Sequence, residues 1–247
     1  QSVQLPYLLL AGGLLLLAVF VLTMRIPSLR EATDAGDPGR HHTYREALRH
    51  PHLCWGVLAI FVYVGAEVSI GSFLINYISG PDTGGLTEAT AARYLAFYWG
   101  GAMVARFIGA GLMIRFDARR LLALAAVIVC ALLATTMAGR GAVAMWSALA
   151  IGLFNSIMFP TIFTTAIERL GTLTSKASSL LIMAIVGGAI IPLLQGALAD
   201  RIGIQHAFVL PLLCYAYIVW YGLRGSRLTG DELATAPAAG RAAGPMH

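Results

Sequence analysis

Charged residues are scarce in this sequence. Only 12% of its 247 residues are Asp, Glu, Lys or Arg, whereas a soluble domain carries about a quarter. Hydrophobic residues make up 58%, and the mean hydropathy is +0.75. So few polar side chains cannot cover a water-soluble globule, which indicates lipid as the solvent for much of the chain. The net charge of +5 does not point to nucleic acid, because the basic residues fall mainly in the connections between apolar runs.

Cysteine is also rare, and the usual signatures of catalytic or metal sites are absent. Cys54, Cys130 and Cys214 lie far apart in apolar runs, a spacing that offers no disulfide framework and predicts buried free thiols. Four histidines share the connection 25–52 but match no ligand pattern. With no paired catalytic carboxylates or nucleophile–base pair in the sequence, we expect neither an enzyme nor a bound metal or cofactor.

Long apolar runs are what the sequence does contain. A helix needs about 20 apolar residues to cross a bilayer, because every backbone polar group must be satisfied internally. The first run follows Gln1 without a basic region or a cleavage site, so it is interpreted as a span and not as a signal peptide. Seven runs qualify as membrane helices, near 5–24, 53–78, 91–114, 119–139, 142–166, 175–197 and 205–224. The sequence therefore predicts an all-α polytopic membrane protein.

Basic residues predict the orientation of these helices. Alternate connections and the carboxyl-terminal tail hold thirteen Arg and Lys residues, whereas the opposite side holds only Arg93, Arg140 and Arg201. Because cytoplasmic loops are enriched in Lys and Arg, the connection 25–52 and the carboxyl terminus are expected in the cytoplasm. The first helix then begins outside, which favours a fragment that starts at an even-numbered helix of a longer protein.

Polar content varies with a period of three helices. Runs 53–78 and 142–166 carry polar side chains, runs 91–114 and 175–197 are rich in Gly and Ala, and the other three have few strongly polar residues. This order predicts lipid-facing, cavity-lining and interface-packing helices in turn. A weak inverted repeat of three helices agrees with it, and such repeats build each half of a major facilitator transporter.

Four segments follow from this pattern. Residues 1–24 are expected to be the last transmembrane helix of a missing amino-terminal half, and 25–52 a cytoplasmic inter-domain loop with a short helix near 44–49. Residues 53–228 are expected to form a six-helix transport bundle, so that the fold is a major facilitator-type bundle preceded by one extra helix. Residues 229–247, rich in Ala, Gly and Pro, are expected to be a disordered cytoplasmic tail.

Polar residues deep within the apolar runs are the candidates for a substrate site. Glu67 is the one acidic residue near the middle of a span, where an unpaired charge costs at least about 2.5 kcal/mol. Asn155 has an amide that suits sugar hydroxyls, and Pro160 follows about one turn later. Both residues also have a structural interpretation: Glu67 could be a paired or protonated carboxyl group, and Asn155 could form an interhelical hydrogen bond. The predicted cavity or substrate residues are Glu67, Asn76, Tyr77, Asn155, Phe159 and Gln195.

Three further charged residues are predicted to gate the cavity or to hold the structure. Arg106 is the one basic residue deep in a span and could pair with Glu67 or lock a helix end. Asp200 and Arg201 lie in a turn where a helix leaves the membrane, and they could pair across a gate.

Four stretches resemble the fucose–galactose–glucose/proton symporter family of the major facilitator superfamily, with the glucose/galactose branch favoured. They are YVGAEVSIGSFLINY at 63–77, FYWGGAMVARF at 97–107, GLFNSIMFPTIF at 152–163 and MAIVGGAIIPLLQG at 183–196. The resemblance extends from the first run to Arg227. It implies a twelve-helix protein that imports sugar with protons by alternating access. It also implies that the known proton-handling carboxylates belong to the amino-terminal half, so none is carried over to this chain.

The predicted function is secondary transport of a hexose (glucose, galactose or fucose) by proton symport across the inner membrane. Its expected partners are the sugar, protons, the lipid bilayer and the missing amino-terminal half. The alternative is a stand-alone seven-helix receptor or sensor. A retinal protein would need a mid-membrane Lys, whereas Lys176, the sole lysine, begins a helix on the cytoplasmic side.

Overall fold

The structure is a computed structural model that describes residues 4–23 and 43–228. The chain divides into two units, Gln1–His41 and His42–His247. In the first unit, α1 (Gln4–Thr23) is a 20-residue helix with apolar residues on every side. Its exposed leucines and Phe20 fit a lipid environment. Most of the predicted connection 25–52 and the predicted tail 229–247 lie outside the described residues.

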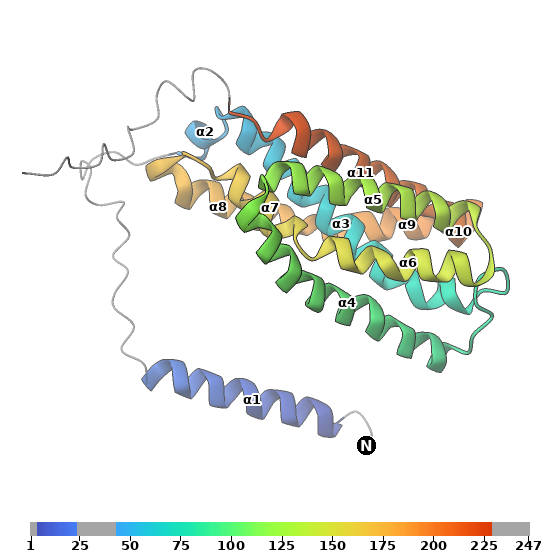
Figure 1. The fold of residues 1–247 in the computed structure, drawn as a ribbon. Coiled ribbons are helices and arrows are strands. Elements are labelled where there is room, and N and C mark those ends of the chain that lie inside the picture. The colour runs from blue at the N-terminus through green and yellow to red at the C-terminus, as the bar shows by residue number, and fades with distance from the viewer. Residues whose placement is uncertain (1–3, 24–42, 229–247) are drawn as a thin grey trace, which may run out of the picture. The chain divides into compact units, whose positions relative to one another are not determined.

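The second unit is a bundle of helices that run side by side along one direction (Figure 1). The short helix expected near 44–49 is present as α2 (Tyr44–Ala47). The rest of the bundle is composed of α3 (Pro51–Ser79), α4 (Glu88–Arg115), α5 (Ala118–Ala138), α6 (Gly141–Asn155), α7 (Met158–Ala166), η2 (Gly171–Leu173), α8 (Thr174–Met183), η3 (Ala184–Val186), α9 (Gly187–Ile202), α10 (Ile204–Ala207), α11 (Val209–Trp220) and η4 (Tyr221–Gly225).

These helices confirm the predicted fold class. Six stretches of the described chain are long and apolar enough to cross a membrane, namely 51–79, 88–115, 118–138, 141–166, 171–202 and 204–225. Together with α1 they correspond to the seven predicted runs, with ends that differ by a few residues. The chain is therefore a multi-pass α-helical membrane protein.

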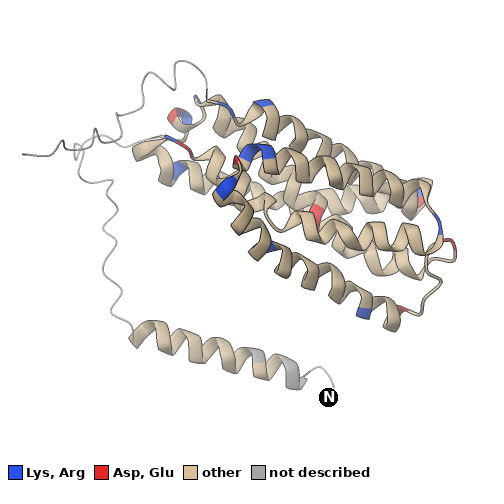
Figure 2. Ribbon diagram, viewed as in Figure 1, with Lys and Arg blue, Asp and Glu red and all other residues tan. Residues whose placement is uncertain are grey.

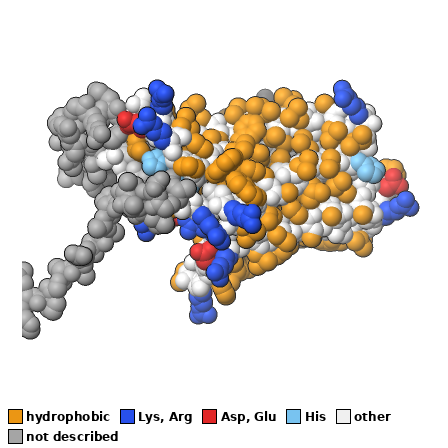
Figure 3. All heavy atoms as spheres, turned by 90° about the horizontal axis from the view of Figure 1, so that it is seen from above, with side chains coloured by type: hydrophobic (Ala, Val, Ile, Leu, Met, Phe, Trp, Pro, Cys, Tyr) orange, Lys and Arg blue, Asp and Glu red, His pale blue; other side chains and the backbone are white. Residues whose placement is uncertain are grey.

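Charge and apolar surface are separated as a membrane requires. Most charged residues lie toward the two ends of the bundle (Figure 2), and hydrophobic side chains cover the middle of the face seen in Figure 3. Glu67 and Arg106 are exceptions, because both lie well inside their spans. One end carries most of the bundle's described basic residues: Arg45, Arg49, Arg115, Arg119, Arg120, Arg169, Lys176, Arg224 and Arg227.

The run 142–166 is one span in the sequence but two helices in the structure. Helix α6 ends at Asn155 and α7 begins at Met158. Pro160 explains the position of this break, because proline has no N–H to donate to the carbonyl four residues earlier, that of Ser156. The break keeps polar backbone groups available in the middle of a membrane span, which is tolerated only where protein or a wet cavity surrounds them.

Glycines allow helices to approach at the contacts that shape the bundle. A Cβ on Gly187 would lie 2.0 Å from the carbonyl oxygen of Phe61, so α9 packs directly on the backbone of α3. A Cβ on Gly152 would lie 2.4 Å from the carbonyl oxygen of Tyr98, so α6 also packs closely on the backbone of α4. Small residues at helix contacts are the usual means of tight packing in lipid.

Arg119 connects three elements at the basic end of the bundle. Its Nη2 donates to the Glu168 carboxylate, just after α7, and to the Ser226 carbonyl, just after η4, at 3.2 Å. Its Nε donates to the same carbonyl at 3.3 Å. A cation placed against the carbonyls at a helix end also interacts favourably with the helix dipole.

Candidate functional site

A cavity of about 510 Å³ lies between α3, α4 and the junction of α6 with α7. Its volume is in the range of small-molecule sites. The junction supplies half of its wall, because the break exposes side chains and backbone there. The lining residues are Tyr63, Glu67, Arg106, Ala110, Met113, Asn155, Ser156, Ile157, Phe159 and Pro160.

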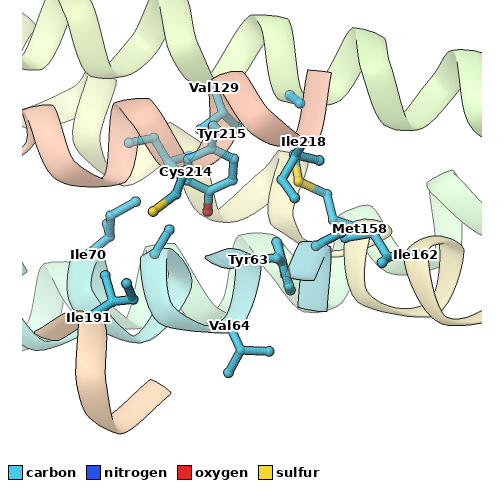
Figure 4. Packing of buried hydrophobic residues seen from close by; sticks show 14 of the residues in the cluster. Tyr63, Val64, Ile70, Val129, Met158, Ile162, Ile191, Cys214, Tyr215 and Ile218 are labelled. Carbon is cyan, nitrogen blue, oxygen red and sulfur yellow. The ribbon is translucent and has the colours of Figure 1, made fainter. Parts of the chain in front are cut away.

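Asn155, at the end of α6, is the polar centre behind this cavity. It is only 1% exposed. Its Nδ2 donates to the Tyr98 hydroxyl at 2.9 Å, and its Oδ1 accepts from the Tyr215 hydroxyl at 2.8 Å. The close approach at Gly152 brings Tyr98 within reach, since Asn155 follows one turn later. Figure 4 shows Tyr215 on α11 projecting toward α3, the helix that carries Tyr63.

Tyr63 connects Asn155 to Glu67. The Tyr63 hydroxyl lies 2.8 Å from the backbone carbonyl oxygen of Asn155 and 2.9 Å from Glu67 Oε1. Tyr63 and Glu67 are one helical turn apart on α3, which places both side chains on the same face. Tyr63 is 1% exposed, whereas Glu67 is half-buried and lines the cavity.

The cavity combines groups of different chemistry. Glu67 supplies a carboxyl group, Arg106 a guanidinium group and Phe159 an aromatic ring, which stacks on Phe163 with 6.2 Å between ring centroids. Arg106 and Glu67 share the cavity, but they form no salt bridge within the described part of the chain. Charged hydrogen-bonding groups beside an aromatic face can bind a polyhydroxylated molecule.

Four of the nine residues singled out from the sequence line this cavity: Glu67, Asn155, Phe159 and Arg106. The others lie elsewhere. Asn76 is exposed near the end of α3, while Asp200 and Arg201 are exposed in the last turns of α9.

Tyr77 and Gln195 are buried in the bundle, outside the lining of the cavity. The Tyr77 hydroxyl donates to the Thr136 carbonyl at 2.7 Å, and its ring packs edge-on against Phe208. Both polar atoms of the Gln195 amide are buried without a hydrogen-bond partner among the described residues. Tyr77 also lines a second pocket of about 250 Å³ between the connection 80–83 and the start of α10, at the end of the bundle opposite the one that carries most basic residues.

Tyr215 is the residue of this network that sequence reasoning missed. The run 205–224 was interpreted as lipid-facing because it has almost no strongly polar side chains. That interpretation gives no weight to phenol groups, although a buried Tyr hydroxyl in a membrane helix needs a partner. Tyr215, Tyr217 and Tyr221 lie close together in one span, and this clustering is the sequence feature that could indicate a buried hydrogen bond.

No group of three or more His, Cys, Asp or Glu side chains that could hold a metal ion occurs in residues 4–23 and 43–228. Of the four histidines in the predicted loop, His50 and His52 are among the described residues, whereas His41 and His42 lie outside them.

Comparison with known proteins identifies what this arrangement resembles. The chain is 51% identical over 227 residues to a glucose/galactose transporter of Brucella abortus, a match that covers 92% of this chain and 54% of the relative. It is 34% identical to the L-fucose-proton symporter of Escherichia coli, over 88% of this chain and 50% of that protein. No family model matches the chain.

A solved structure supports the same assignment. The major facilitator superfamily transporter FucP, in its outward conformation, matches with a TM-score of 0.79 and 32% identity, over 92% of this chain and 55% of that chain. The chain thus spans about half the length of each of these relatives. All three are named as transporters or symporters, which agrees with the prediction of a transporter and not an enzyme. The chain belongs to the major facilitator superfamily and corresponds to the carboxyl-terminal half of transporters of the fucose–galactose–glucose/proton symporter family.

Proposed function

We propose that this chain forms the carboxyl-terminal half of a secondary active hexose transporter that works by alternating access, with glucose or galactose as the favoured substrate and fucose as the alternative. The higher identity to the glucose/galactose transporter than to the fucose symporter supports this order. Proton symport is proposed by analogy with the name of the fucose relative. A seven-helix receptor is not favoured, because the relatives are transporters.

The observation that carries the proposal is the cavity beside the break between α6 and α7. It offers Glu67 and Arg106 as hydrogen-bonding groups and Phe159 as a ring that can stack on a sugar face. Transporter sites are commonly built near the bilayer midplane, where helices are interrupted. Asn155 orients the network behind the cavity, and we propose positioning as its role because its amide already bonds to two tyrosines.

The second half of the substrate site would come from an amino-terminal six-helix bundle. Helices α4 and α8–α9 support this, because only 17% of the apolar window of α4 and 28% of that of 171–202 are buried, against 61% for 141–166. We propose that these exposed faces pack against the other bundle. The basic end of the bundle, with the connection 25–52 and the carboxyl terminus, would face the cytoplasm of a cell whose inner membrane holds the protein.

Sugar counterflow tests the proposal directly. The protein that contains this chain is reconstituted into liposomes loaded with unlabelled glucose, galactose or fucose, and entry of the labelled sugar is followed. We expect counterflow of glucose and galactose to exceed that of fucose. Glu67→Gln should lower counterflow about tenfold or more, because a hydrogen bond to a charged group contributes about 1.5–3 kcal/mol.

Glu88→Gln is the matched control. It makes the same chemical change at an exposed position in the first turn of α4, outside the lining of the cavity. If correctly folded protein gave no more counterflow of any of the three sugars than liposomes without protein, hexose transport would be refuted. Equal counterflow in Glu67→Gln and wild type would instead remove Glu67 from the substrate site.

A further inference from the structure

The Tyr63 hydroxyl has two oxygen neighbours and a single proton. Glu67 Oε1 lies 2.9 Å from it and the Asn155 carbonyl oxygen 2.8 Å, both within hydrogen-bond distance. A carbonyl oxygen can only accept, and a phenol donates one proton. If Tyr63 donates to the carbonyl, its contact with Glu67 is a full hydrogen bond only when the carboxyl group brings its own proton.

The two forms of Glu67 therefore make different hydrogen bonds. A protonated Glu67 donates to the Tyr63 oxygen, and Tyr63 donates to the Asn155 carbonyl, so that both contacts are satisfied. An ionised Glu67 competes with the carbonyl for the one phenol proton. The carboxylate is the stronger acceptor, because hydrogen bonds to charged groups are about twice as strong as neutral ones. The Asn155 carbonyl then loses its donor.

That carbonyl lies where the membrane helix is interrupted. Helix α6 ends at Asn155, and the last carbonyls of a helix have no partner within it. The structure gives this carbonyl the Tyr63 hydroxyl as its partner. Helix α7 begins three residues later, and the Thr161 N–H bonds to the carbonyl of Ile157, not to that of Asn155. A change at Glu67 is thus transmitted across one hydroxyl to the end of a second helix.

The groups around Glu67 leave both of its forms accessible. Arg106 on α4 lines the same cavity and brings a positive charge, which favours a carboxylate, whereas Ala110, Met113 and Ile157 supply apolar walls, which favour a neutral acid. Tyr98 on α4 and Tyr215 on α11 are the other titratable groups of the same network, and both bond to the Asn155 amide. The junction of α6 and α7 contributes only neutral groups, and water in the cavity can accept or return the proton.

We propose that Glu67 is a proton-binding site in this half of the protein, and that the Tyr63 hydroxyl transmits its protonation state to the break between α6 and α7. The use of this proton to drive sugar rests on the proposed function, but proton binding does not. The resemblance implies proton-handling carboxylates in the amino-terminal half. The proton site proposed here is a further one, because it requires only residues of this chain.

Infrared difference spectroscopy measures the proton without measuring transport. The protein that contains this chain is titrated with acid and base in lipid, as wild type and as Glu67→Gln, Tyr63→Phe and Glu88→Gln. We expect one protonated-carboxyl band that disappears as the pH rises, is lost in Glu67→Gln and persists in Glu88→Gln. In Tyr63→Phe the band should shift in frequency, because its hydrogen-bond acceptor is gone. The phenol band assigned to Tyr63 should shift with the same pH midpoint.

The outcomes separate this proposal from hexose transport. Identical carboxyl difference spectra of wild type and Glu67→Gln would overturn proton binding, whatever the sugar assays give. A titrating Glu67 band with an unchanged Tyr63 phenol band would overturn the transmission step. Failure of counterflow in a protein that shows both bands would refute the hexose proposal and leave the proton site established.

Discussion

Asn155 contributes three polar groups to the bundle, and each meets a tyrosine hydroxyl. Its carbonyl meets Tyr63, its amide nitrogen donates to Tyr98 and its amide oxygen accepts from Tyr215. These tyrosines come from α3, α4 and α11, so one residue at the end of α6 connects four helices. A buried polar network whose members are all satisfied fixes helix positions more specifically than apolar packing does. Asn155 therefore fixes the positions of the helices around the proposed site.

At this scale the hydroxyl of Tyr215 is the most direct target. Tyr215→Phe keeps the ring and leaves Asn155 Oδ1 buried without its donor. We expect a loss of about 1 kcal/mol in stability, since interhelical hydrogen bonds in membranes contribute about 0.6–1.7 kcal/mol. Thermal unfolding in detergent measures it. Tyr94→Phe is the control, because the aromatic contacts of Tyr94 with Phe97 and Trp146 survive the change. Equal melting temperatures for the two variants would contradict a stabilising role for the Tyr215 hydroxyl.

At the scale of elements, the contact of α9 with α3 depends on glycines, and Gly187 makes the closest approach. Gly187→Ala would place a Cβ 2.0 Å from the Phe61 carbonyl oxygen, so the two helices must separate. We expect a destabilisation of about 1–3 kcal/mol, the usual cost of overpacking. Gly111→Ala in α4 adds the same methyl group where nothing lies within 4 Å. Helix propensity predicts that this control is neutral or up to about 1 kcal/mol more stable. Unfolding measurements that gave both variants the same sign would refute this account of the α3–α9 contact.

The contacts of Arg119 at the basic end of the bundle can be tested by comparing it with its neighbour Arg120. Arg119→Gln removes the contacts with Glu168 and with the Ser226 carbonyl, which join α5 to the ends of α7 and η4. The Arg119 and Glu168 side chains are 26% and 38% exposed, so solvent screening limits the expected loss to about 1 kcal/mol. Proteolysis near 224–228 should become faster. Arg120→Gln changes the exposed neighbour and keeps the hydrogen bond that the Arg120 backbone N–H donates to the Asp117 carboxylate. Equal cleavage rates in the two variants would exclude a role for Arg119 in holding this end.

The same elements show what the sequence alone could predict. The number of membrane spans, their approximate ends and the polar character of the runs 53–78 and 142–166 follow from hydropathy and from backbone satisfaction in lipid, which act locally. Proline at position 160 favours a kink in the run 142–166, and the structure adds that the helix breaks between Asn155 and Met158. The tertiary partners could not be predicted, because they depend on how helices rotate about their axes. Thus Gln195 was expected at the site and is buried elsewhere, whereas Tyr215 was expected to face lipid and bonds to Asn155.

At the scale of the whole molecule, exposure within the bundle is uneven. The faces of α4 and α8–α9 remain largely open, although these helices are rich in small residues suited to close packing. Their large exposed side chains include Trp99, Phe107, Met183 and Leu193. In a chain that spans about half of its relatives' length, such surfaces fit the proposed packing against a second bundle.

Orientation is the remaining property of the whole molecule that the charge distribution predicts. The end with Arg119 and Arg120 should be cytoplasmic, and the end with the connection 80–87 external. The three native cysteines are first replaced by Ala, and one new cysteine is then introduced, either by Asp82→Cys or by Arg120→Cys. Both positions are exposed and lie at opposite ends of the bundle. A membrane-impermeant maleimide should label intact cells at position 82 and should label position 120 only after the membrane is opened. The reverse labelling pattern would show the opposite orientation, in which the basic end of the bundle and the connection 25–52 are external. Labelling of both positions in intact cells would instead indicate that the protein lacks a single orientation.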